Sequence, residues 1–123
     1  MSKRFCFSRD QILRQNAGLA ALRDFCAAKG QTPFLTAAHE ALTNAARHGS
    51  GKTDEIVFRA GKSDRYWTMC VFQRKKIRFE PCDRPFCGTA LMKKNCVRLR
   101  VLPTQNALFL AVEKEVLKTA RQP

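Results

Sequence analysis

Residues 39–49 read HEALTNAARHG. In a helix, Glu40 and Asn44 would lie one turn apart on the same face, because they are separated by four residues. The letters around them are mostly alanine, which any helix accepts readily. The polar pair is therefore either the solvated side of an amphipathic helix or a functional site, and the surrounding sequence has to decide between the two.

The stretch lies in a segment with a complete set of helix signals. Thr32 is a good N-cap, Pro33 suits the first helical position, and Gly49 is a typical C-terminal stop. One arc of this helix is apolar and is formed by Leu35, Ala38, Leu42, Ala45 and Ala46. We expect this arc to pack on the rest of the protein, with the polar pair on the opposite side.

The segments on either side of this helix alternate between strand and helix patterns. We predict, in order, a strand RFCFS (4–8), a helix from the capping box SRDQ (8–11) to Gly30, the helix 32–48, a hairpin of DEIVFRA (54–60) and RYWTMCVFQ (65–73), a basic loop (74–88), a short helix TALMKKNC (89–96), and strands VRLRVL (97–102) and NALFLAVE (106–113). This order predicts a single domain over residues 1–123. Its fold class is α+β, a two-layer sandwich with a mixed, mostly antiparallel sheet covered on one face by helices.

The net charge restricts the partners. Lys and Arg number 23 against 10 Asp and Glu, which gives a formal charge of +13. Such a surface attracts nucleic acid, nucleotide phosphates or an acidic protein. No apolar run is long enough to span a membrane, and the N-terminus lacks the apolar core of a secretory signal, so we expect a cytoplasmic protein without a membrane partner.

The cysteines do not indicate a disulfide scaffold, because the composition is that of a normal core. Cys26 and Cys70 fall within apolar patterns and are expected to be buried. Cys82, Cys87 and Cys96 have the spacing C-x4-C-x8-C with no histidine nearby. That spacing is not typical of a zinc site, so we expect free thiols and no zinc.

The opening stretch resembles the N box of the GHKL ATPase superfamily, which includes gyrase and the histidine kinases. It is most similar to the small anti-sigma factor serine kinases, whose N box reads A-x-x-E-A-x-x-N-A-x-x-H-G. The matching residues are Ala37, Glu40, Ala41, Asn44, Ala45, His48 and Gly49. The resemblance spans nearly the whole chain and implies a Bergerat-type fold that uses ATP and Mg²⁺.

The resemblance also implies roles for single residues. Asn44 would bind Mg²⁺ through the nucleotide, and Glu40 would act as the catalytic base. His48 would serve the phosphates. Nucleotide phosphates would be cradled at the Gly-rich turn, formed here by Gly88, Thr89 and Ala90.

The sequence departs from the family where adenine would be recognised. The family's D-x-G-x-G loop corresponds to QRKKI, with Gln73 near the Asp position and Lys75 and Ile77 near the glycines. An unpaired donor on the base would cost about 1–3 kcal/mol. Catalysis as a protein serine kinase is therefore an open question at this stage.

Three functions remain open on the sequence. The first is an ATP- and Mg-binding regulator of the anti-sigma factor type, which acts on a protein partner in transcription control. The second is a non-catalytic module of the same fold that binds an acidic protein, such as a sigma factor or its antagonist, and forms a homodimer. The third is a nucleic-acid-binding module built from the loop 74–78, the strand 97–101 and exposed Tyr66 or Trp67.

Overall fold

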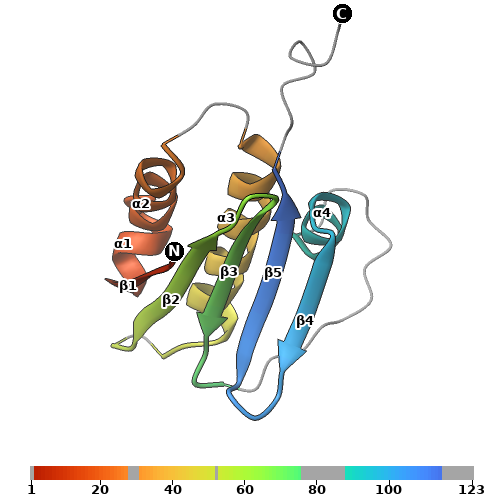
Figure 1. Cartoon of the computed structure of the whole chain (residues 1–123). Helices are drawn as coiled ribbons and strands as arrows, with labels where there is room; N and C mark the ends of the chain where they lie inside the picture. The colour runs from red at the N-terminus through yellow and green to blue at the C-terminus, as the bar shows by residue number, and fades with distance from the viewer. Residues whose placement is uncertain (1, 28–30, 52, 76–87, 115–123) are drawn as a thin grey trace, which may run out of the picture.

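The computed structural model describes residues 2–27, 31–51, 53–75 and 88–114 of the chain (Figure 1). It contains five strands and four helices in these residues. In chain order they are β1 (Ser2–Ser8), α1 (Arg9–Leu13), α2 (Ala17–Cys26), α3 (Thr32–His48), β2 (Glu55–Lys62), β3 (Tyr66–Phe72), α4 (Gly88–Asn95), β4 (Arg98–Leu102) and β5 (Ala107–Glu113).

The five strands form one sheet in the order β1-β2-β3-β5-β4. All four neighbouring pairs are antiparallel. Figure 1 shows α3 crossing behind the middle of the sheet, with α1 and α2 beside β1 and β2 and with α4 beside β4. The two-layer α+β sandwich is thus confirmed, with a sheet that is antiparallel throughout its described strands rather than mixed.

The core lies between the helices and one face of the sheet. Side chains alternate along each central strand, as the two-residue period of a half-covered sheet requires. On β2, Ile56, Phe58 and Ala60 are buried against the helices. Val57 and Arg59 point to the other face, which no described helix covers.

The structure corrects two helix boundaries. The helix expected over 8–30 is two helices, since Asn16 adopts a left-handed conformation (φ 51°) between α1 and α2. The capping box itself is present: Ser8 accepts a hydrogen bond from the Gln11 amide, and the Gln11 side chain accepts one from the Ser8 amide. At α3, the N-cap position falls on Gln31 rather than Thr32, with proline in the first turn.

Trp67 is a core residue, contrary to its predicted exposure. Its side chain is 3% exposed and stacks on Phe34 with ring centroids 5.8 Å apart. Because side chains alternate along β3, the burial of Trp67 places Tyr66 on the open side, where it is partly exposed. No helix in the described ranges is long and apolar enough to cross a membrane.

Candidate functional site

Helix α3 has one buried apolar side and one partly exposed polar side. The side chains of Ala37, Ala38, Ala41, Leu42, Ala45 and Ala46 are all buried. Small alanines let the helix backbone approach the sheet closely. Glu40 and Asn44 are partly exposed, as predicted from their position opposite the apolar arc.

The two flanks of α3 differ. On one flank α2 packs so closely that a Cβ on Gly18 would lie 2.7 Å from Leu42 Cδ1. Asn44 follows Leu42 by two residues and so points about 200° around the helix from it. The opposite flank is taken by α4, which packs along α3 (Figure 1). Asn44 therefore lies toward the α4 side.

Glu40 lies on the side of α3 opposite its buried arc, and it borders a groove between α3 and α2. The groove has a volume of about 230 Å³, and its other lining residues include Leu19, Arg23, Thr36 and His39. Asn44 is not among the lining residues of this groove. Glu40 and Asn44 therefore lie on one face of the helix, but of the two only Glu40 lines this groove.

The C-terminal end of α3 is joined to the end of β3. The Gly49 carbonyl accepts hydrogen bonds from the amides of Arg74 (3.1 Å) and Lys75 (3.0 Å). A Cβ on Gly49 would overlap the side chain of Gln73, which rests directly against this glycine. A side chain at residue 49 would therefore displace the Gln73 side chain, and the contact places the Gln73 carboxamide beside the end of α3.

Asn106, in the turn between β4 and β5, is hydrogen-bonded to the segment 73–75 that follows β3. We call this junction of Gly49, Gln73 and Asn106 the corner. The side-chain amide of Asn106 donates to the carbonyl of Gln73 (2.5 Å) and to that of Lys75 (3.0 Å), and the Asn106 carbonyl accepts from the Gln73 amide (3.0 Å). Asn106 has a left-handed backbone (φ 47°), which asparagine tolerates well. The sequence analysis missed this residue, although an isolated Asn before a strand is a signal for a turn of this kind.

The other predicted nucleotide residues lie on α3 and α4. His48 is exposed in the last turn of α3. Gly88, Thr89 and Ala90 form the first turn of α4, which begins one residue before the predicted helix 89–96. Lys93 and Lys94 follow in its last turn and are exposed. The segment 76–87, which contains Ile77, lies outside the described residues.

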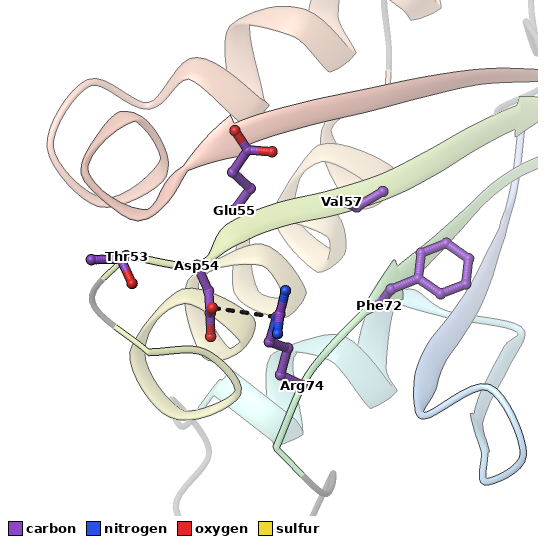
Figure 2. A pocket seen from close by; sticks show the side chains of 6 residues that line it. All are labelled: Thr53, Asp54, Glu55, Val57, Phe72 and Arg74. Atoms are coloured by element: carbon purple, nitrogen blue, oxygen red, sulfur yellow. Dashed lines mark ion pairs between the residues drawn. The ribbon is translucent and has the colours of Figure 1, made fainter.

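A hollow of about 400 Å³ that the sequence did not reveal opens beside the ends of β2 and β3 (Figure 2). Figure 2 shows Asp54 and Arg74 pointing toward each other across it, with 3.3 Å between Arg74 Nε and Asp54 Oδ1. Asp54 also accepts a hydrogen bond from the Gly51 amide (2.7 Å). The apolar side of the hollow is formed by Val57 and Phe72.

The described cysteines are free thiols. Cys26 is buried as predicted, and burial raises its pKa to about 11. Cys70 is only partly buried, because it lies on the open side of the sheet. Cys96 packs against the core, where burial raises its pKa to about 11. Cys82 and Cys87 lie outside the described residues.

No group of three or more His, Cys, Asp or Glu side chains suited to a metal ion occurs in the part of the chain that the structure describes. Comparisons with known proteins leave the family open: no protein-family model matches the chain, and no curated protein matches it. The assignment of a function therefore depends on the residues and their placement.

Proposed function

We propose that the chain is a cytoplasmic, ATP- and Mg-binding regulatory protein of the anti-sigma factor (serine kinase) type, which acts on a protein partner in transcription control. The observation that carries the proposal is the position of Asn44. Its side chain is partly exposed, lies toward the α4 flank of α3, and makes no side-chain hydrogen bond to another described residue. A polar group held in this way is free to bind a ligand.

The residues present suit a magnesium ion that arrives with a nucleotide. Mg²⁺ prefers oxygen ligands, keeps several waters and is usually bound by few protein groups together with substrate phosphates. The carbonyl oxygen of Asn44 would supply one such ligand. The partial exposure of Asn44 leaves space for the waters and phosphates that complete the coordination.

Gln73 is the residue we propose for the base end of the site. In the resemblance to the GHKL family it falls near the position of the Asp, and its carboxamide lies against Gly49 at the end of α3. A carboxamide oxygen can accept a hydrogen bond from the amino group of adenine, as a carboxylate would, while its NH₂ can donate a second one. The substitution therefore retains an acceptor for base recognition at this corner.

The phosphate end would be formed by the first turn of α4, with positive charge supplied by α4 and by the last turn of α3. Backbone N–H groups at a helix N-terminus favour anions, and residues 88–90 supply this turn. Lys93, Lys94, Arg47 and His48 are all exposed cationic or potentially cationic side chains of α4 and α3. They would attract phosphates electrostatically.

We assign Glu40 a role toward the partner protein. It borders the groove between α3 and α2, outside the flank that we assign to the nucleotide. A partner segment seated in this groove would bring a serine hydroxyl next to the Glu40 carboxylate, which could orient it or accept its proton. The charge of +13 favours an acidic partner.

Isothermal titration of the full chain with Mg-ATP tests the proposal. We expect saturable binding that weakens at least tenfold in Asn44→Ala and about tenfold in Gln73→Ala, which loses the acceptor for the base. Thr43→Ala is the matched control, because Thr43 is the neighbour of Asn44 on a different side of the helix and should leave affinity unchanged. An absence of heat with wild type, or equal affinity in Asn44→Ala, would refute the proposal.

A further inference from the structure

The described helices cover one face of the sheet, and we call the other face the open face. Arginine side chains recur across the strands of this open face. The strand registers align its side chains in rows that run across all five strands. The central row is Arg4, Arg59, Cys70, Phe109 and Arg100. A neighbouring row ends in Arg98 on the edge strand β4. This strand therefore presents two arginines, Arg98 and Arg100, next to each other on the open face.

The arginines of the open face are not neutralised. Arg4, Arg59, Arg98 and Arg100 are exposed, and none forms an ion pair with a described carboxylate. Arg4 and Arg59 are direct cross-strand partners, an arrangement that costs stability because like charges face each other. The sheet thus retains an electrostatic cost that a bound anion would relieve.

Among the residues that the structure describes, the open face has two acidic side chains, which lie at the ends of strands, and both have a partner. Glu55, at the end of β2, accepts a hydrogen bond from Cys6 Sγ (2.9 Å). Glu113, at the end of β5, lies 3.6 Å from Arg65. The middle of the open face therefore carries one sign of charge across the full width of the sheet.

Aromatic and apolar side chains lie beside the arginines. Phe109 and Tyr66 border a hollow of about 410 Å³ together with Arg98 and Val97. Val97 is 57% exposed. Among the described residues, it is the one large hydrophobic side chain that is exposed. An exposed apolar side chain beside two aromatic rings and an arginine forms a surface suited to a flat, apolar-faced ligand with a negative charge nearby.

We infer that the open face binds single-stranded nucleic acid. In this arrangement Arg4, Arg59 and Arg100 hold phosphates, and bases stack on Phe109 and in the hollow beside Tyr66. Adjacent strands are about 4.8 Å apart. The backbone of Phe109 on β5 therefore lies roughly 5 Å from that of Arg100 on the neighbouring β4, and roughly 10 Å from that of Arg59 on β2, two strands away. Bases on an aromatic side chain with phosphate contacts on both sides are a general way in which open sheets bind single strands.

Charge makes this occupant preferable to a second copy of the chain. Two open faces brought together would bury several unpaired arginines on each side, while Glu55 and Glu113 of this face already have partners. The proposed ATP site lies on the opposite side of the sheet, in the helical layer. Nucleic-acid binding at the open face is therefore independent of the proposed function, and the two can fail separately.

Fluorescence anisotropy of end-labelled twelve-nucleotide oligo(dT) and oligo(U) tests the inference with the full chain. We expect log K to fall linearly with log salt for at least one of the two strands. Each phosphate contact on a single strand contributes about 0.7 to the slope, so replacing Arg4, Arg59 and Arg100 by alanine should reduce the slope by about 2. Phe109→Leu keeps an apolar side chain and should weaken binding about tenfold by loss of stacking.

Arg23→Ala is the matched control, since it removes one exposed positive charge from α2 in the helical layer. It should change the affinity less than twofold, whereas Arg59→Ala should weaken binding about fivefold or more. Trp67 fluorescence and circular dichroism confirm that each variant is folded. Salt-independent binding, preference for a duplex, equal loss in Arg23→Ala and Arg59→Ala, or a wild-type dimer that the arginine substitutions dissociate would each overturn the inference.

Discussion

Removal of the Phe34 ring should destabilise the protein more than any other single truncation near the N-box helix. Phe34 is fully buried in the first turn of α3 and stacks on Trp67 of β3 at an interplanar angle of 22°. Phe→Ala substitutions in cores cost about 3–5 kcal/mol, and the loss of an aromatic pair adds to the cost of the cavity. We therefore expect Phe34→Ala to lower the free energy of unfolding by about 4 kcal/mol.

Urea unfolding measures this loss directly. Trp67 is the single tryptophan of the chain and is buried, so its fluorescence reports the transition. With a urea m-value of about 2 kcal/mol per molar, a loss of about 4 kcal/mol moves the midpoint down by roughly 2 M. Circular dichroism provides a second probe, because Phe34 contacts the fluorophore itself.

Val97→Ala is the control, since Val97 is 57% exposed and its truncation should change stability by less than about 0.5 kcal/mol. A loss below about 1 kcal/mol in Phe34→Ala would show that α3 is not anchored to the sheet through this stack. The placement of Asn44 relative to the sheet would then lose its structural basis.

Further predictions concern a close contact, a thiol and a helix cap. Gly18→Ala should lower stability by about 1 kcal/mol, seen as a fall in Tm of about 4 °C, because overpacking against Leu42 outweighs the gain in helix propensity. The pKa of the Cys96 thiol is about 9 in the unfolded chain and about 11 in the folded protein. Between pH 9 and 11 the unfolded state therefore loses a proton that the folded state keeps, so the free energy of unfolding should decrease as the pH rises. The decrease should be less steep in Cys96→Val. At pH 8, mass spectrometry should show slower alkylation of Cys96 than of exposed Cys6. Ser8→Ala should cost about 0.5–2 kcal/mol in urea unfolding, by loss of the capping box; no measurable change would contradict the cap.

Most of the fold could be predicted because its signals are local. Alternation on β2 and β3, helical spacing on α3 and the capping box at Ser8 each depend on residues close in the sequence. The break at Asn16 was missed because the helical pattern of apolar residues continues across it. Trp67 was misplaced because a two-residue period fixes which residues share a face, not which face is covered.

The candidate site was predictable only in part, for a physical reason. The resemblance to the N box made Glu40 and Asn44 candidate residues, and helical geometry predicted correctly that both lie on the partly exposed side of α3. The corner formed by Gly49, Gln73 and Asn106 depends on contacts between residues that are far apart in the chain, which no local pattern contains. The aligned arginines of the open face likewise appear only when the strand order is known.

Amide chemical-shift mapping on the ¹⁵N-labelled full chain tests the central claim that nucleotide binds in the helical layer. With Mg-ATP we expect the largest shifts at Gly49, Gln73 and Ala90, and little change at Arg59 and Phe109 on the open face. Asn44→Ala should remove these shifts while leaving the rest of the spectrum intact. Shifts concentrated on the open face, or none at any nucleotide concentration up to several millimolar, would contradict the account.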